Sequence, residues 1–194
     1  MRDEKGTINR DEGDVLKGLA AGLIGGLVAS WTMNRFQDVW MKLAGSQSSG
    51  AGSQQQAEGH VSEQGLQQTQ KNSDEEQDDA TVKTASAISE GIFDHKLTKS
   101  EKKIAGPIVH YAFGTSVGGL YGAAAELAPE VKTGAGLPFG AAFWLVADET
   151  ALPLLGLSKG PTAYPVSTHV YALASHFVYG LTAELVRRGV RGAL

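Results

Sequence analysis

The stretch IAGPIVHYAFGTSVGGLYGAAA, residues 104–125, decides the fold class of this chain. It contains no Asp, Glu, Lys or Arg, and about 20 apolar residues are enough to span the hydrocarbon core of a bilayer. Gly106, His110, Gly114, Gly118 and Gly122 recur every four residues and therefore share one helical face. So many glycines destabilise a soluble helix, whereas a membrane helix uses them for close packing. The stretch predicts a transmembrane helix.

Three other segments are largely apolar. They are residues 15–33 of a first transmembrane helix predicted over 15–43, residues 134–157 and residues 166–186, and the first two also carry small residues at four-residue spacing. The chain is therefore predicted to be all-α, a four-helix transmembrane bundle. The residues expected to pack these helices are Gly18, Gly22, Gly26, Gly114, Gly118, Gly122, Gly136 and Gly140.

The remaining segments are polar. Residues 1–14 are expected to be a polar N-terminus and residues 189–194 a C-terminal tail. Residues 44–80 hold nine Gln, seven acidic residues and one Lys, so they cannot bury enough apolar area to offset their ordering entropy and are predicted to be a disordered linker. Residues 81–97 are predicted to be a short amphipathic helix that lies on the membrane surface or packs against the other helices. A capping box of Thr98 and Glu101 then begins a three-helix membrane region, residues 98–188.

Charge bounds the partners and the topology. The net charge is −4 and no basic run is present, which argues against nucleic acid, and the lack of cysteine excludes disulfides and thiolate metal sites. Four spans place both termini on one side, and Arg187, Arg188 and Arg191 beside the last span favour the cytoplasm. Arg187 and Arg188 are expected to extend to the headgroups. The expected partners are the lipid bilayer and either further copies of the chain or a larger membrane complex.

The two halves of the chain resemble each other. GLAAGLIGGLVASWT (residues 18–32) aligns without gaps with GLPFGAAFWLVADET (136–150), and YGxxxEL occurs at residues 121–127 and again at 179–185. Both matches occur in the same order. The sequence therefore predicts that the bundle is built from two repeated helical hairpins in parallel orientation.

Three stretches also resemble a known family. GPIVHYAFGTSVGGLYGAAAEL (residues 106–127), VADETALPLLGL (146–157) and YPVSTHVYALASHFVYG (164–180) are similar to the YagU-type family of small bacterial inner-membrane proteins. The resemblance covers about residues 81–188. It implies a helical fold in the bacterial inner (cytoplasmic) membrane, and it brings no established activity and no catalytic residue.

Ionisable side chains within the apolar segments are the candidate functional residues. A charge in the middle of a bilayer is costly, at about 2.5–3.5 kcal/mol on insertion scales, so such side chains tend to face the bundle interior. Asp148 and Glu149 differ by about 100° around a helix, so only one of them can point fully at the bundle axis. The candidate polar cluster consists of His110, Asp148, Glu149, His169, His176 and Glu184.

Several interpretations of this cluster stay open. It could relay protons or handle a cation or small solute, in which case His110 and Asp148 are expected to be essential and His176 to assist. It could instead be structural, with histidines hydrogen-bonded to carboxylates across helices, or it could bind a metal, although no HExxH or ExxH spacing is present. No sequence motif predicts an enzyme or assigns a cofactor. The alternative function class is a non-catalytic accessory or assembly subunit of a membrane complex.

Overall fold

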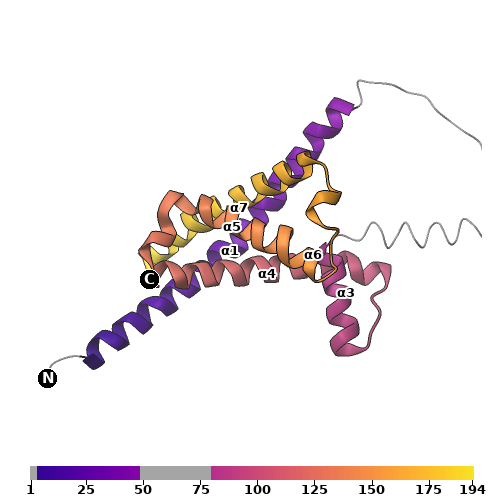
Figure 1. Cartoon of the computed structure of the whole chain (residues 1–194). Helices are drawn as coiled ribbons and strands as arrows, with labels where there is room; N and C mark the ends of the chain where they lie inside the picture. Colours follow the sequence, from indigo (N-terminus) through magenta and orange to yellow (C-terminus); the bar gives the residue numbers. More distant parts are fainter. Residues whose placement is uncertain (1–3, 49–79) are drawn as a thin grey trace, which may run out of the picture.

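The computed structural model describes residues 4–48 and 80–194, and the α1 side chains only from Gly13 to Leu43. Within these residues the chain is almost entirely helical and has no strand, which confirms the all-α class (Figure 1). One helix among them is long and apolar enough to cross a membrane, over Gly13–Leu43, with a mean hydropathy of 1.4. The predicted linker lies outside the described residues except at its edges.

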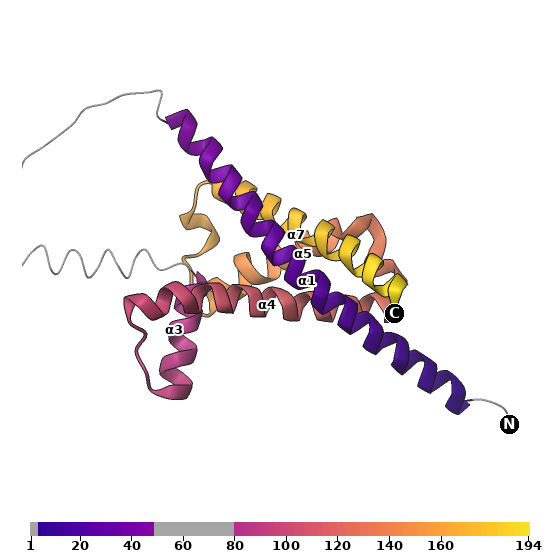
Figure 2. The same ribbon diagram turned by 180° about the vertical axis from the view of Figure 1, so that it is seen from behind.

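The longest element is α1 (Glu4–Ser48), which extends past the other helices at both ends (Figures 1 and 2). The prediction assigned residues 1–14 to a separate polar terminus and ended the first helix at residue 43. The helix instead includes most of that terminus and continues to Ser48. An existing helix gains one hydrogen bond for each residue it adds, so polar flanks can continue it at little cost.

The helix α1 packs antiparallel against α4 (Lys99–Leu127) through glycines of both helices. A Cβ atom built on Gly118 would lie 2.4 Å from the Cα of Gly26, and one built on Gly122 would lie 2.1 Å from the carbonyl oxygen of Gly18. These neighbours are backbone atoms, so a side chain at either position would push the two helices apart.

The second helix pair is formed by α5 (Leu137–Val146) and α7 (Val166–Ala193). Gly136 begins α5 at a φ of 84°, and a Cβ there would lie 2.1 Å from the carbonyl oxygen of Gly180. Both the left-handed backbone and the close approach therefore require glycine. The helix α7 also packs against α1, and it continues through most of the predicted C-terminal tail.

The predicted third span is not one regular helix. The segment η1 (Pro129–Gly136) precedes α5 and consists of 3₁₀ turns interrupted by non-helical backbone at Thr133, Gly134 and Ala135. A π-helical turn, η2 (Ala147–Ala151), follows α5. The chain then continues through α6 (Leu152–Leu154) and the 3₁₀ helix η3 (Pro161–Ala163) into α7. The predicted span 134–157 thus contains a regular helix over only part of its length.

The short helix α3 (Ala80–Phe93) packs against the N-terminal part of α4, so one of its two predicted placements is observed. A Cβ on Gly106 would lie 2.7 Å from Cγ2 of Val82, which shows how closely the two helices approach. The helix ends at Phe93, four residues earlier than predicted, and Ile92 and Phe93 at its end are exposed.

The predicted capping box is present at the start of α4. The backbone N–H of Thr98 donates to Glu101 Oε2 at 2.7 Å, and the backbone N–H of Glu101 donates to Thr98 Oγ1 at 3.3 Å. The bond from the Thr98 backbone, helped by bonds from the Thr98 and His95 side chains, holds the pKa of the Glu101 carboxyl below its ordinary value of 4.5.

The distribution of side chains between interior and surface differs from that of a typical water-soluble protein. The buried residues are mostly Gly and Ala, and the others are Met33, Tyr121, Tyr179, Ser30, Ser175, His176, Glu184 and Arg187. Large apolar side chains point outward instead, among them Leu27, Ile108, Leu120, Val146 and Leu185. Soluble proteins rarely bury Glu or Arg, and they seldom expose extended apolar surface.

Candidate functional site

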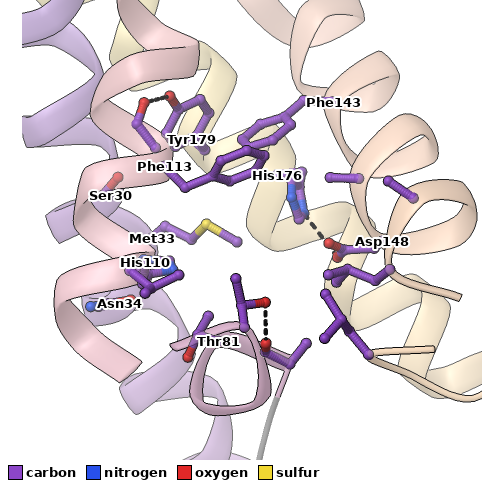
Figure 3. A pocket seen from close by; sticks show the side chains of 18 of the residues that line it. Ser30, Met33, Asn34, Thr81, His110, Phe113, Phe143, Asp148, His176 and Tyr179 are labelled. Atoms are coloured by element: carbon purple, nitrogen blue, oxygen red, sulfur yellow. Dashed lines mark hydrogen bonds and ion pairs between the residues drawn. The ribbon is translucent and has the colours of Figure 1, made fainter. Parts of the chain in front are cut away.

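The structure contains a partly open cavity of about 650 Å³ (Figure 3). Residues from α1, α3, α4, α5, η2, α6 and α7 contribute to its wall, and α3 and α6 lie together at one end of the bundle (Figure 1). Its polar and ionisable lining residues are Ser30, Asn34, Gln37, Thr81, Thr84, His110, Asp148, His176 and Tyr179. The cavity thus brings together three of the six residues of the predicted polar cluster.

His176 is the buried member of these three and is 4 % exposed. Its Nδ1 lies 2.9 Å from the carbonyl oxygen of Ala172, one helical turn earlier, and 3.8 Å from Oδ2 of Asp148 (Figure 3). The second distance is too long for a direct hydrogen bond. The ring also packs against Phe143 in a T-shaped arrangement, with the two ring centroids 5.0 Å apart. These contacts fix the imidazole beside the carboxylate without a direct hydrogen bond between the two.

Asp148 reaches the cavity from the π-helical turn η2. The N–H of Leu152 donates to the carbonyl oxygen of Ala147, five residues earlier, and Thr150 Oγ1 donates to the carbonyl oxygen of Leu145, also five residues earlier. The wider turn alters the direction of the side chains in this segment. Turns of this kind are frequent at functional sites.

Glu149 takes part in a separate contact. Its Oε1 lies 2.7 Å from Nδ1 of His169, whose Nε2 lies 3.0 Å from the carbonyl oxygen of Pro161. Neither Glu149 nor His169 lines the cavity. Of the acidic pair, Asp148 faces the cavity and Glu149 ties η2 to the start of α7.

His110 enters the cavity from α4, one turn before Gly114, and its ring meets that of Tyr111 at 5.5 Å between centroids. Next to it, Asn34 of α1 donates through Nδ2 to the Tyr111 hydroxyl at 3.2 Å. The two histidines therefore approach the cavity from different helices, α4 and α7 (Figure 3).

Aromatic rings close the inner end of the cavity. Phe143 packs against Phe113 at 5.7 Å and against Tyr179 at 5.2 Å between centroids. The Tyr179 hydroxyl donates to the carbonyl oxygen of Gly114, linking α7 to α4. Phe139 continues this cluster toward the other end of the bundle.

Glu184 lies beyond this aromatic cluster and is fully buried. Arg187 donates to it through Nε at 2.7 Å and through Nη2 at 3.1 Å, Arg188 donates through Nε, and the Tyr121 hydroxyl donates at 2.9 Å. Arg187 is 3 % exposed, so the expectation that it extends to the headgroups is wrong. An Arg that can reach a buried carboxylate gains charge-assisted hydrogen bonds there.

Sequence reasoning missed most of this ion-paired cluster. Glu126 of α4 accepts from Arg187 at 3.4 Å and from Arg191 at 3.1 Å, and Arg191 also donates to Asp14 of α1 at 2.7 Å. The spacing of Glu184 to Arg187 and Arg188 (i to i+3 and i+4) was the available signal, because such residues face each other on a helix. The contacts to α1 and α4 had no comparable signal.

A metal centre has little support in the described ranges. Among residues 13–43 and 80–194, whose side chains the structure describes, no group of three His, Cys, Asp or Glu residues is arranged to hold a metal ion. His110, Asp148 and His176 share a cavity without converging on one point in this way.

Comparison with known proteins places the chain in a family. A family model described as "Protein of unknown function (DUF1440)" matches residues 81–185. The chain belongs to the DUF1440 family. The DUF1440 match covers α3, α4 and α5 and most of α7, so it includes His110, Asp148 and His176, whereas α1 lies outside it. No curated protein and no solved structure matches the chain.

Proposed function

We propose that this DUF1440 protein is a multi-pass integral membrane protein of the bacterial inner membrane, of the YagU type. The supporting observation is the distribution of side chains, in which Glu184 and Arg187 are inside and Leu120, Val146 and Leu185 are outside. Lipid tails solvate apolar side chains, so helices in a membrane associate through small residues and buried polar contacts instead. The glycine contacts between α1 and α4 fit this rule.

Four crossings are proposed, formed by α1, α4, α7 and the continuous segment α5–η2–α6. That last segment covers residues 137–154, and at about 1.5 Å per residue it approaches the thickness of the hydrocarbon core. The exposed Leu145 and Val146 lie on it. Glycine, histidine and acidic residues lower the hydropathy of α4 and α7, and α5 taken alone is too short to span a bilayer, so length and hydropathy together select only α1 among the described helices.

The two helix pairs are proposed to be duplicated hairpins. The alignment equates Gly18 with Gly136 and Gly122 with Gly180. A Cβ on Gly122 would lie 2.1 Å from the Gly18 oxygen, and one on Gly180 would lie 2.2 Å from the Gly136 oxygen. Gly22 and Gly140 are the next aligned pair. The Cβ on Gly122 would lie 2.7 Å from the Cα of Gly22, and the Cβ on Gly180 would lie 3.0 Å from the Cα of Gly140. Aligned residues thus make equivalent contacts.

The function that the cavity supports best is the handling of protons or of a small cationic solute by His110, Asp148 and His176. The observation that carries this proposal is the convergence of the three side chains, from three separate elements, on one cavity of about 650 Å³. Intramembrane ionisable residues that face a cavity mark ion and proton pathways in membrane proteins. Histidine is suited to the task because it titrates near neutral pH when unperturbed.

The test is flux through the full-length protein reconstituted into liposomes. A pH-sensitive dye inside the vesicles would report proton movement, and release of a trapped cation would be followed in parallel. Asp148→Asn and His110→Gln are expected to abolish flux, and His176→Gln to reduce it. Glu149→Gln is the matched control, because it removes the neighbouring carboxylate outside the cavity, and it should retain flux.

Two results would overturn this function. One is a wild-type protein that is folded and inserted but moves neither protons nor cations. The other is equal loss of flux in Asp148→Asn and Glu149→Gln together with equal loss of thermal stability. In either case the cavity residues are structural, and co-purification of the protein with a larger complex in mild detergent would then identify it as an accessory subunit.

A further inference from the structure

The charge on the cavity wall is unbalanced. Asp148 supplies the one carboxyl group among the residues that line the cavity, and no Lys, Arg or Glu is found among them. The remaining polar groups are hydroxyls, side-chain amides and the two imidazoles. An anion would meet the carboxylate with no fixed positive charge to offset it.

The Asp148 carboxylate is also available to a ligand. Within the described residues its charged partner is His176, at 3.8 Å, and no hydrogen bond joins them. Its side chain is 34 % exposed, whereas that of Glu149 is 14 % exposed and is held by His169 at 2.7 Å. A carboxylate held at the wall of a mostly apolar cavity can be stabilised by a positively charged ligand.

The rest of the wall suits an apolar ligand body. The rings of Phe113, Phe143 and Tyr179 lie together at the inner end, and His176 lies between them and Asp148 (Figure 3). Leu152 and Leu155 line the side next to η2. Aromatic faces attract cations, and more strongly where water is excluded.

We propose that the cavity binds an organic cation with a bulky apolar body, such as a quaternary ammonium or phosphonium ion. Asp148 is its counter-ion, and Phe113, Phe143 and Tyr179 enclose its apolar groups. The inference rests on the proposed function in that it names the class of solute for the same cavity. A bare metal ion is disfavoured because the described residues hold no group of three His, Cys, Asp or Glu side chains that could bind it.

The experiment measures binding of tetraphenylphosphonium to the purified full-length protein in detergent, by equilibrium dialysis at pH 8 against protein-free micelles. Tetraphenylborate has the same shape and the opposite charge, so it is the matched control ligand. The wild type is expected to bind the phosphonium and to exclude the borate. Asp148→Asn should weaken phosphonium binding by about tenfold or more, and Asp148→Glu should restore part of it.

Control variants separate binding from folding. Glu149→Gln should bind like the wild type, and Phe143→Leu should weaken binding while leaving the charge preference intact. The thermal stability of each variant is measured in the same detergent, and phosphonium binding is compared only between variants of equal thermal stability. The same preparations are then assayed for flux in liposomes.

Three results would overturn the inference: no phosphonium binding by folded wild type, equal binding of phosphonium and borate, or equal phosphonium binding by Asp148→Asn. Failure of the proposed function is a different outcome. There, phosphonium binding would depend on Asp148 while no proton or cation crosses the liposome membrane, and the cavity would be a binding site without transport.

Discussion

The helix pairs α1–α4 and α5–α7 share glycine contacts at one end and differ in the residues at the aligned positions further along. In both pairs, glycines at aligned positions bring the backbones together near Gly18 and Gly122 or near Gly136 and Gly180. The α1–α4 pair then continues this contact through Gly26, Gly118 and Ser30. In the α5–α7 pair the aligned positions hold Trp144, His176 and Asp148. At His176 the second pair is still in close contact, because a Cβ on Gly140 would lie 2.2 Å from the His176 carbonyl oxygen, but the side chains of His176 and Asp148 face the cavity.

The largest expected effect compares the aligned glutamates of the two pairs. Glu184→Ala would leave Arg187 buried without its bidentate partner, so it should lower the free energy of unfolding by about 3–5 kcal/mol. Glu126→Ala should cost about 1 kcal/mol, because Glu126 is partly exposed and Arg187 keeps Glu184. Denaturation in mixed micelles measures both. Equal losses would contradict the larger contribution assigned to Glu184.

The aligned glycines give the next test. Gly122→Ala and Gly180→Ala each place a Cβ about 2 Å from a backbone oxygen of the partner helix, and overpacking of this kind costs roughly 1–3 kcal/mol. Gly122→Ala should cost more, because the long α1–α4 contact cannot shift as freely as the shorter α5–α7 contact. Gly189→Ala in α7 is the control, because nothing lies within 4 Å of its Cβ position and alanine favours helix. The thermal midpoint in detergent ranks the three, and a destabilised control would void the comparison.

The aligned tyrosines sharpen the same comparison. Tyr121→Phe removes a hydrogen bond to the carboxylate of Glu184 and should cost about 1.5–3 kcal/mol, the range for bonds to charged groups. Tyr179→Phe removes a bond to the Gly114 carbonyl and should cost about 1 kcal/mol. Both variants keep the ring and its packing. A larger loss of stability in Tyr179→Phe than in Tyr121→Phe would show that the hydrogen bond at the inner end of the cavity contributes more than the bond to Glu184.

The smallest effect concerns the start of α4 next to α3, a region that has no counterpart in the α5–α7 pair. Thr98→Ala removes the N-cap and should weaken the first turn of α4 by about 1 kcal/mol, whereas Thr98→Ser should retain it. Amide hydrogen exchange in residues 99–102 measures this.

The same turn should depend on pH. The pKa of Glu101 is lowered in the folded chain, so its contribution is present above the ordinary value of 4.5 and is lost as pH falls through the lower folded value. Protection of these amides should therefore decrease in acid. A turn whose protection rises below pH 4.5, or does not change there, would contradict the role of the Glu101 carboxylate.

The helical class and the small-residue contacts could be predicted because they depend on short sequence periods. Gly114, Gly118 and Gly122 reveal one face of a helix, and Thr98 with Glu101 reveals a helix start, without knowledge of the tertiary structure. The candidate residues His110, Asp148 and His176 stood out for a similar reason, since each is ionisable and lies in an apolar segment. Their common cavity depends on how the helices are placed relative to one another, and the periodicity of the sequence does not predict that placement.

The arrangement of charges could not be predicted for a physical reason. Arg187 lies next to Arg188 in sequence, and a surface position is the usual one for both. What brings Arg187 inside is the combined presence of Glu184 on its own helix and Glu126 on α4. Likewise, the separation of Glu149 from Asp148 follows from the π-helical turn and from His169, neither of which has a sequence signature.

The turn η2 also has a consequence for how this segment can vary in length. A π-helical turn holds one residue more than an α-helical turn closed over the same height, and the N–H of Leu152 reaches back to Ala147 across that extra residue. Deleting one residue within 147–151 would therefore convert the turn to regular α-helix and leave α5 and α6 in their original registers. A deletion elsewhere in α5 would rotate all that follows by about 100°. The acidic pair thus lies where the chain can lose a residue without losing the helix, and where such a loss would remove or redirect one carboxylate.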